Sequence, residues 1–585
     1  MSKRALLSGN EAIARGAYEA GIHVATAYPG TPSTEILENV AKYKEIYSEW
    51  STNEKVALEV GMGASFGGAR TLTAMKHVGV NVAADPLFTF AYTGTDGGFV
   101  LVSADDPGMH SSQNEQDNRR YAKFAKWALL EPSDSHECKE LVKEAIKVSE
   151  KFNTPVLLRL STRLSHSKGL VELGERDEVE RKPYTCDISK RVVLPAHARK
   201  LHVKLEERLK KMEEYSNESP FNVIEEGDTK IGIISSGISY QYAKEAFPKA
   251  AFLKLGMSFP FPKKLTRKFA DMVDKIYVIE ENEPFIEEEM LQMGIEVIGK
   301  DKVPIAGELS QRRVAEAFDL NLAAPADVKT DDLPARPPVL CPGCPHRGIF
   351  YITNKMKLNT TTDIGCYTLG VLPPLNCGET CVCMGASITN AFGLELGQGK
   401  EFGKKTVAFI GDSTFMHSGM TGLANVAYNK GNITTALLDN SITAMTGHQE
   451  HPGTGKTLMG DDSISTDYVK VAEAVGVKDI HVTDAFDLKD IEKALKATTT
   501  KDGPSLVINK GRCILLDYKK IKVTPMAVDS EKCIACGLCL KVGCPALSRD
   551  SKTKKAKIDM YLCAGDHCEI CKQVCPKDAI GPIEK

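Results

Sequence analysis

The residues best suited to chemistry are eight cysteines near the end of the chain, which fall into two interlocking runs. The first run is Cys533-x2-Cys536-x2-Cys539-x4-Cys544-Pro545, and the second is Cys563-x4-Cys568-x2-Cys571-x3-Cys575-Pro576. Three closely spaced thiolates can hold three irons of a cubane cluster, and the fourth ligand, followed by proline, typically comes from the other run. The spacing therefore predicts two 4Fe–4S clusters, one held by Cys533, Cys536, Cys539 and Cys575 and one by Cys544, Cys563, Cys568 and Cys571.

Both runs depart from the usual bacterial spacing, one by a longer final gap and one by a longer first gap. A disulfide framework and zinc ribbons are the alternatives, but two Cys-Pro endings at this register suit neither well. The chain has 17 cysteines and no recognisable export signal, which favours a reducing compartment where thiols bind metals. We therefore expect a cytoplasmic protein from an oxygen-averse setting that transfers electrons one at a time.

The bulk composition is that of an ordinary globular protein. The 585 residues are 42% hydrophobic and 26% charged, and the net charge of −3 gives no reason to expect nucleic acid or an anionic membrane as a partner. No apolar run approaches the ~20 residues needed to span a bilayer, and the first residues lack the apolar core of a signal peptide. At ~150 residues per domain, the length predicts about four domains.

The positions of strand-like and helical segments suggest where these domains lie. Residues 1–185 alternate helical stretches with candidate strands, which predicts a parallel sheet wrapped by helices. These strands are 22–27, 71–74, 98–103 and 154–160. A charged helical segment at 187–227 leads into a smaller unit of the same kind, with candidate strands at 230–237, 250–256 and 275–282.

A segment rich in Ala, Asp and Pro at 323–338 reads as a linker before a third α/β unit. We see no short-period repeat. The expected domains are 1–185, 186–330, 335–520 and 521–585.

Polar residues end two neighbouring strands in the third unit. A buried-strand pattern at 404–413 ends in Gly411-Asp412, and a second at 432–441 ends in Asp439-Asn440, with an apolar-periodic helix at 419–431 between them. Right-handed crossover geometry places Asp412 and Asn440 side by side at the carboxyl edge of the sheet. With the carbonyl of Ile442 they make a hard-oxygen site for Mg²⁺, whose other positions would go to a diphosphate and water.

These residues resemble a known cofactor motif. Gly411-Asp412-Ser413, followed after the helix by Asp439-Asn440, resembles the diphosphate-binding motif of thiamine diphosphate enzymes. The next residues, 445–449, resemble the loop that continues this motif in 2-oxoacid:ferredoxin oxidoreductases. The resemblance implies that thiamine diphosphate and Mg²⁺ bind here. The residues implied are Gly411, Asp412, Ser413, Asn440, Ile442 and His448.

The first unit resembles the pyrimidine-binding domain of the same family, over residues 28–34 and 51–57. The resemblance implies that Glu54 hydrogen-bonds N1′ of the aminopyrimidine and so activates the cofactor, and that Thr31 contacts substrate or cofactor. A helix N-terminal acid is the alternative role for Glu54, with Glu59 as the rival carboxylate. A turn or N-cap residue is the alternative for Thr31. The polar segment 103–118 could approach the substrate.

The resemblance also implies a third cluster, held by a separate group of cysteines. Related enzymes carry a cluster beside thiamine, and four cysteines match the order of its ligands; the alternative is four unligated thiols. The four are Cys341, Cys344, Cys366 and Cys513. Cys377, Cys381 and Cys383 are further candidates, whereas Cys138 and Cys186 are expected to be ordinary thiols.

The resemblance covers nearly the whole chain. It implies a multi-domain α/β fold: transketolase-like thiamine domains, a transketolase-C-like middle domain and a C-terminal ferredoxin-like α+β domain with two clusters. This order resembles the large (alpha) subunit of indolepyruvate:ferredoxin oxidoreductases. It implies oxidative decarboxylation of aryl 2-oxoacids to the acyl-coenzyme A, with electrons passed to ferredoxin and a smaller beta subunit as partner. The alternatives are oxidation of another 2-oxoacid, a non-oxidative thiamine diphosphate decarboxylase with structural clusters, and an electron-transfer subunit with a degenerate thiamine half.

Overall fold

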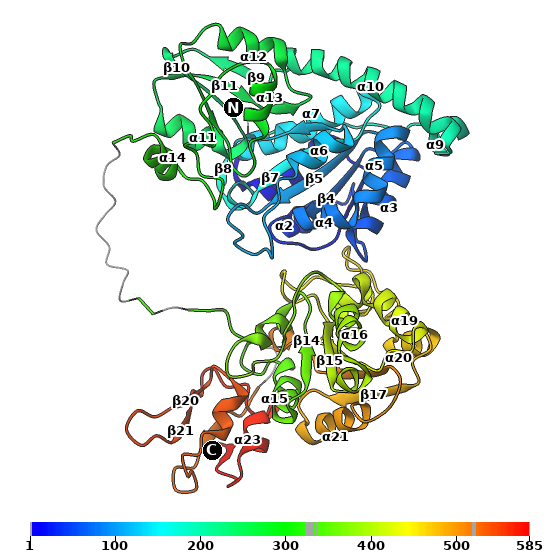
Figure 1. Cartoon of the computed structure of the whole chain (residues 1–585), viewed down its shortest axis with the longest axis vertical. Coiled ribbons are helices and arrows are strands. Elements are labelled where there is room, and N and C mark those ends of the chain that lie inside the picture. The colour runs from blue at the N-terminus through cyan, green and yellow to red at the C-terminus, as the bar shows by residue number, and fades with distance from the viewer. Residues whose placement is uncertain (1–2, 322–332, 335, 518–521, 584–585) are drawn as a thin grey trace. The chain divides into compact units, whose positions relative to one another are not determined.

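The structure is a computed structural model that describes residues 3–321, 333–334, 336–517 and 522–583. The chain divides into two compact units, Met1–Val328 and Lys329–Lys585 (Figure 1). The first unit contains the two domains predicted at 1–185 and 186–330, and the second contains the other two. The predicted linker falls largely outside the described residues, and the four domain boundaries stay predictions.

A seven-stranded sheet forms the centre of the first unit. Its order is β12-β6-β7-β5-β4-β2-β3, and every neighbouring pair is parallel except β12 with β6. The strands are β2 (Val24–Ala27), β3 (Tyr47–Trp50), β4 (Thr71–Lys76), β5 (Phe99–Asp105), β6 (Ala128–Leu130), β7 (Val156–Ser161) and β12 (Met257–Phe259). The strands β4 and β5 are buried along their whole length, as expected of parallel strands covered on both faces. The four strands predicted here are confirmed to within two residues at either end.

Helices wrap this sheet (Figure 1). Helix α1 packs against α7, and α3 packs against α5. Local capping sets the ends of α7, because Asp134 accepts a hydrogen bond from the N–H of Glu137 and Asn153 ends the helix in the left-handed conformation. The helices are α1 (Gly9–Glu19), α2 (Thr34–Val40), α3 (Glu54–Phe66), α4 (His77–Val82), α5 (Ala84–Thr93), α6 (Arg119–Ala125), α7 (Ser135–Phe152) and α8 (Thr162–His166). An antiparallel pair, β1 (Lys3–Ser8) with β8 (Lys168–Leu173), completes this part.

The rest of the first unit holds a four-stranded sheet of order β13-β10-β11-β9. Its strands are β9 (Asn222–Glu225), β10 (Asp228–Ser236), β11 (Ala250–Leu255) and β13 (Ile276–Ile279), and its helices are α9 (Ile188–Arg191), α10 (Pro195–Glu218), α11 (Gly237–Ala246), α12 (Lys263–Ala270), α13 (Phe285–Gln292) and α14 (Gln311–Ala317). The three strands predicted here are confirmed. The sequence did not predict that β12 leaves this segment to pair with β6 of the larger sheet. One apolar core also spans both parts, since it includes Trp127 and Leu157 of the first part together with Leu253 and Phe269 of the second.

The second unit contains a parallel five-stranded sheet of order β14-β15-β16-β18-β17. Its strands are β14 (Asn359–Thr361), β15 (Thr406–Gly411), β16 (Thr434–Asp439), β17 (Asp479–Asp484) and β18 (Ser505–Lys510). The principal helices are α15 (His346–Met356), α16 (Ala386–Gln398), α19 (Met420–Tyr428), α20 (Tyr468–Ala474) and α21 (Leu488–Thr498). The predicted strand–helix–strand unit is confirmed as β15, α19 and β16.

The cysteine-rich tail forms two small antiparallel pairs. One pair joins β19 (Met526–Val528) to β22 (Ile580–Pro582), and the other joins β20 (Leu547–Arg549) to β21 (Ala556–Ile558). The short helix α23 (Ile570–Val574) lies between β21 and β22 in sequence. In the described part of the chain, no helix combines the length and the apolarity that crossing a membrane would need.

Candidate functional site

Glu54 is the first residue of α3 and lies buried in the first unit. Asn53 caps the helix, since its side chain accepts a hydrogen bond from the N–H of Val56 at 2.9 Å. Gly79 leaves room for the carboxyl group, because a Cβ at that position would lie 2.8 Å from Glu54 Oε1. Glu59, the rival carboxylate, is exposed and forms an ion pair with Lys55. Of the two, only Glu54 is enclosed by the fold; its catalytic role stays a prediction.

The loop that carries Thr31 follows β2 at the carboxyl edge of the same sheet. Asn10 holds it by donating a hydrogen bond to the carbonyl of Pro32 at 2.7 Å. The N-cap of the following helix is Ser33 rather than Thr31. Thr31 is half-buried, and its proposed contact with substrate or cofactor stays a prediction.

The segment 103–118, which continues from β5, is anchored at both ends. At its start, Asp106 accepts hydrogen bonds from the backbone of Ser111 and the hydroxyl groups of Ser112 and Thr162. At its end, Asp117 lies 2.6 Å from the guanidinium of Arg119. These contacts fix the loop over the carboxyl edge of the sheet.

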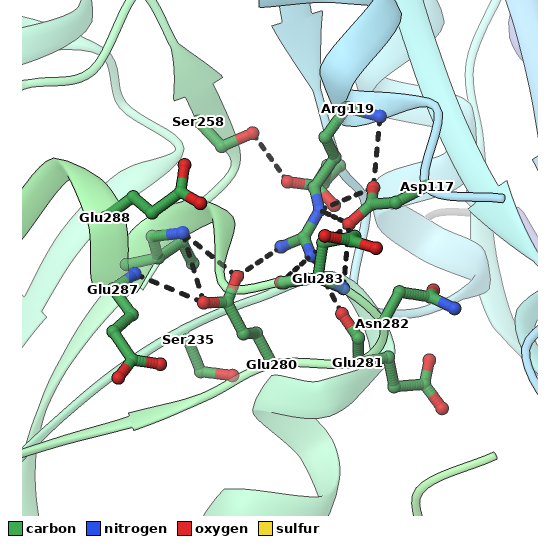
Figure 2. Close-up of polar contacts among 12 residues, drawn as sticks. Asp117, Arg119, Ser235, Ser258, Glu280, Glu281, Asn282, Glu283, Glu287 and Glu288 are labelled. Carbon is green, nitrogen blue, oxygen red and sulfur yellow. Dashed lines mark hydrogen bonds and ion pairs between the residues drawn. The ribbon is translucent and has the colours of Figure 1, made fainter. Parts of the chain in front are cut away.

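Arg119 belongs to a buried ionic network that joins the larger sheet to the end of β13 (Figure 2). Its guanidinium donates to Glu280 at 2.5 Å and to the carbonyl of Glu281 at 2.8 Å. Burial opposes ionisation of Asp117, but Arg119 and Arg159 outweigh it and lower the pKa of that carboxyl to about 2. Buried ion pairs hold a geometry because breaking one leaves an uncompensated charge. No motif or spacing in the sequence indicated this network.

In the second unit, Asp412 and Asn440 lie at neighbouring strand ends, as predicted. Gly411 pairs with Leu438 across β15 and β16. Asp412 is buried, and its two carboxylate oxygens accept the N–H groups of Ser413 at 2.9 Å and Ser441 at 2.8 Å. The predicted adjacency is thus confirmed, whereas metal binding by these oxygens stays a prediction.

The remaining residues predicted for this site lie close by but differ in what they contact. The N–H of Ile442 donates to Asn440 Oδ1 at 3.2 Å. His448 has a left-handed backbone, and its Nε2 lies 3.9 Å from the sulfur of Cys513. The structure therefore brings His448 to a candidate cluster ligand.

Two histidines that were not predicted from the sequence as site residues also face this edge. His451 Nε2 lies 3.4 Å from Asp412 Oδ2. His346 Nε2 lies 3.5 Å from Asn440 Nδ2, and burial lowers the pKa of His346 to about 4 although the charge of Asp412 opposes this. His346 is therefore neutral. The only sequence signal for it was its place directly after Cys344-Pro345.

The four cysteines proposed for a third cluster come together near the same edge. Burial raises the pKa of Cys344 and of Cys366 to about 12, and the neighbouring thiol of Cys341 adds to both shifts. Cys341 likewise adds to the raised pKa of Cys513, again after burial. The N–H of Cys513 donates to the carbonyl of Asn440 at 3.0 Å. The backbone of Cys513, a candidate cluster ligand, is thus hydrogen-bonded to the backbone of Asn440, a candidate magnesium ligand.

The three further cysteine candidates, Cys377, Cys381 and Cys383, have other groups as neighbours. The thiol of Cys377 is buried and donates to the carbonyl of Phe350 at 3.2 Å. Cys381 and Cys383 lie near Asp363, whose negative charge contributes to their raised pKa after burial. In the first unit, Cys138 is buried and Cys186 is exposed.

The eight tail cysteines line two separate pockets. One pocket is lined by Cys533, Cys536, Cys539 and Cys575, and the other by Cys544, Cys563, Cys568 and Cys571. This is the grouping that the interlocking runs predicted; the clusters themselves stay a prediction. Backbone N–H groups point at the sulfurs of Cys563 and Cys575 at 3.3 Å each.

Contacts within the second unit join the third cysteine group to the tail. Gly343, between Cys341 and Cys344, lines the second tail pocket, and a Cβ there would lie 2.5 Å from the Cβ of Ala564. Arg347 is buried and donates to the carbonyls of Leu340 and Gly543. The loop of the third group is therefore fixed against the tail.

The donor sets suit the implied cofactors. Thiols that line pockets suit iron–sulfur clusters, and carboxylate, amide and carbonyl oxygens suit Mg²⁺. Two buried polar atoms of the loop after β16, His451 Nε2 and Thr443 Oγ1, make no hydrogen bond within the described ranges, although His451 Nε2 lies within ion-pair distance of Asp412. Within those ranges, no three His, Cys, Asp or Glu side chains converge on a position for a single metal ion.

Comparison with known proteins places these features in a family. Residues 15–208 match the family described as "Pyruvate flavodoxin/ferredoxin oxidoreductase, thiamine diP-bdg", and residues 363–508 match "Thiamine pyrophosphate enzyme, C-terminal TPP binding domain". The chain is 44% identical to the indolepyruvate oxidoreductase subunit IorA of Thermococcus kodakarensis, over 100% of this chain and 98% of the relative. It is 43% identical to the subunit of the same name from Archaeoglobus fulgidus, over the same shares.

A solved structure of a 2-oxoglutarate:ferredoxin oxidoreductase from Magnetococcus marinus is also similar. The TM-score is 0.47 at 18% identity, and the match covers 54% of this chain and 66% of that one.

Proposed function

The chain belongs to the family of indolepyruvate oxidoreductase IorA subunits, and from this premise we propose how its residues perform the reaction. The reaction is the oxidative decarboxylation of indolepyruvate and similar aryl 2-oxoacids. The 2-oxoacid and coenzyme A give the acyl-coenzyme A, CO₂ and a proton, and two ferredoxins each take one electron. Thiamine diphosphate, when bound, supplies the nucleophilic carbon and the electron sink that such a decarboxylation needs.

Glu54 is the residue we assign to cofactor activation. Its carboxyl group would share a proton with N1′ of the aminopyrimidine, and its burial against Gly79 keeps water from competing for that hydrogen bond. Thr31, on the loop beside it, would contact the substrate or the cofactor. Both assignments rest on the motif and on the enclosure of Glu54 by the fold.

The diphosphate would be held in the second unit through Mg²⁺. Asp412, Asn440 and the carbonyl of Ile442 would supply oxygen ligands, with Gly411 and Ser413 at the strand end and His448 on the adjoining loop. Hard-oxygen ligands of this kind leave positions for phosphate oxygens and water.

We assign two 4Fe–4S clusters to the tail pockets and a third to Cys341, Cys344, Cys366 and Cys513. The observation that carries the oxidative assignment is the hydrogen bond from the N–H of Cys513 to the carbonyl of Asn440. It places a candidate cluster ligand directly beside the residue that would hold the cofactor's metal. A non-oxidative decarboxylase with purely structural clusters has no need of this contact.

The relatives are named as subunits, so we propose a smaller beta subunit as partner, together with ferredoxin and coenzyme A. We also propose a cytoplasmic location, because thiols that bind clusters need a reducing compartment.

The test is an anaerobic assay of the assembled enzyme with a panel of 2-oxoacids, coenzyme A and ferredoxin. We expect ferredoxin reduction that requires both indolepyruvate and coenzyme A, with two electrons transferred per CO₂ released. CO₂ release without ferredoxin reduction would indicate a non-oxidative decarboxylase. Failure to consume any 2-oxoacid would indicate an electron-transfer subunit with a degenerate thiamine half.

A further inference from the structure

Lys76 is a buried cation at the carboxyl edge of the larger sheet of the first unit. It is the last residue of β4, and Ala74 of that strand pairs with Ala27 at the end of β2. Its side chain lies against the loop that carries Thr31, because a Cβ on Gly30 would be 3.0 Å from Lys76 Cβ. Only 8% of Lys76 is exposed to solvent.

The ammonium group of Lys76 is only partly satisfied by the fold. It donates one hydrogen bond, to the carbonyl of Ser111 at 2.8 Å, although an ammonium carries three N–H donors. Among the described residues no carboxylate lies within ion-pair distance of it. The carboxylate whose charge acts on it, that of Asp106, already accepts three hydrogen bonds.

Lys76 and Glu54 lie at the same part of the fold. Lys76 directly precedes α4, and Gly79, in the first turn of that helix, contacts the Glu54 carboxyl group. The backbone of Lys76 therefore lies within one helical turn of the glycine that packs against the residue assigned to cofactor activation. It also lies beside the Thr31 loop and the segment 103–118.

A buried cation without a partner is costly, and an anion that binds beside it would offset that cost. Burial lowers the pKa of Lys76 to about 8, although the charge of Asp106 opposes this shift. The amine is therefore mostly protonated at neutral pH and keeps donors for a ligand. The anion that the reaction brings to this edge is the carboxylate of its 2-oxoacid.

We propose that Lys76 binds the carboxylate of the 2-oxoacid substrate. This inference rests on the proposed function and adds a residue that determines specificity for an acid over a neutral carbonyl compound. The interaction belongs to the ground state, because the carboxylate loses its negative charge as it leaves as CO₂. Its removal should therefore raise KM more than it lowers kcat.

A purely structural role is the competing interpretation. In that case Lys76 serves only to tie the loop at Ser111, and its loss would disturb the pocket for acids and neutral compounds alike. Lys76→Met removes the charge and keeps most of the stem, whereas Lys76→Arg keeps the charge. The exposed Lys55 of α3, in an ion pair with Glu59, provides a matched control as Lys55→Met.

The experiment measures binding of an aryl propionate and of its primary amide to the assembled enzyme, together with KM and kcat for the 2-oxoacid. For Lys76→Met we expect acid binding and KM to worsen at least tenfold, with amide binding within twofold of wild type. Lys76→Arg should recover part of the acid binding, and Lys55→Met should match wild type. Iron content and exchange of the thiamine C2 proton, which need no substrate, show that each variant is folded and loaded.

Unchanged acid binding and KM in Lys76→Met, in an enzyme that oxidises 2-oxoacids, would overturn this inference alone. Equal losses for the acid and the amide would also overturn it, in favour of the structural role. A wild-type enzyme that oxidises no 2-oxoacid would instead overturn the proposed function.

Discussion

The backbone of Gly343 lies against Ala564, so that the loop between Cys341 and Cys344 closes one side of the tail pocket lined by Cys563 and Cys568. The two candidate cluster sites therefore share a wall. Gly343 also has a left-handed backbone, with φ of 73°, which glycine adopts without strain.

Substitution of Gly343 should separate these two sites. The Cβ of Gly343→Ala would lie 2.5 Å from the Cβ of Ala564, and overpacking of this kind costs about 1–3 kcal/mol. We expect a lower denaturation midpoint and slower ferredoxin reduction, with C2-proton exchange unchanged. Gly393→Ala is the control, because nothing lies within 4 Å of a Cβ there. Ferredoxin reduction at the wild-type rate in Gly343→Ala would show that this contact does not matter for electron transfer.

Iron content tests the three cysteine groups. Anaerobically purified protein should hold about eight irons if only the tail binds clusters, and about twelve if the third group does too. Cys513→Ser should then lower the iron count by about four. Cys377→Ser should leave the count unchanged, because the thiol of Cys377 donates a hydrogen bond to the carbonyl of Phe350. An unchanged iron count in Cys513→Ser would contradict the assignment of a third cluster.

How far the sequence predicted this arrangement depends on how local each signal was. Asp412 and Asn440 could be paired in advance because parallel strand ends meet at one edge, and the tail cysteines because their two runs interlock. His451 and Lys76 follow no spacing rule. They reach their sites only once the sheets have formed.

The same reason explains two features of the fold that the sequence did not reveal. Arg119 meets Glu280 across 161 positions of sequence, and no local pattern records such a contact. The strand β12 is too short to signal that it joins the larger sheet, since an edge pairing depends on tertiary packing.

Loss of the magnesium ligands should weaken cofactor binding. Asp412→Ala and Asn440→Ala each remove a hard-oxygen ligand, so we expect the affinity for thiamine diphosphate with Mg²⁺ to fall at least tenfold, about 1.4 kcal/mol. Iron content of the tail should stay unchanged. Calorimetric titration of the cofactor measures this effect, with the exposed Asp461→Ala as control. Wild-type affinity in both variants would mean that Asp412 and Asn440 do not bind the cofactor's metal.

The pH dependence of KM should report the charge of Lys76. Its pKa is lowered to about 8, so the protonated, substrate-binding form is present below that pH and is lost as the pH rises through it. The charge that acts on Lys76 is that of Asp106, and the neighbouring His77, on which Asp105 and Lys76 both act, has its own pKa lowered by burial. We expect KM for the 2-oxoacid to rise above about pH 8 in wild type but not in Lys76→Arg, whose guanidinium stays charged. A flat profile in wild type would argue against a titrating substrate ligand.

The most direct test of the central claim is exchange of the thiamine C2 proton in Glu54→Gln. A carboxyl group at N1′ acts by sharing a proton, and general acid–base contributions are typically ~10²–10⁴-fold. We predict that Glu54→Gln folds, keeps its iron and binds thiamine diphosphate, yet exchanges the C2 proton at least a hundredfold more slowly. Glu59→Gln, at an exposed carboxyl group paired with Lys55, should exchange at nearly the wild-type rate. Near wild-type exchange in Glu54→Gln, with slow exchange in Glu59→Gln, would contradict the assignment of Glu54 as the activating residue.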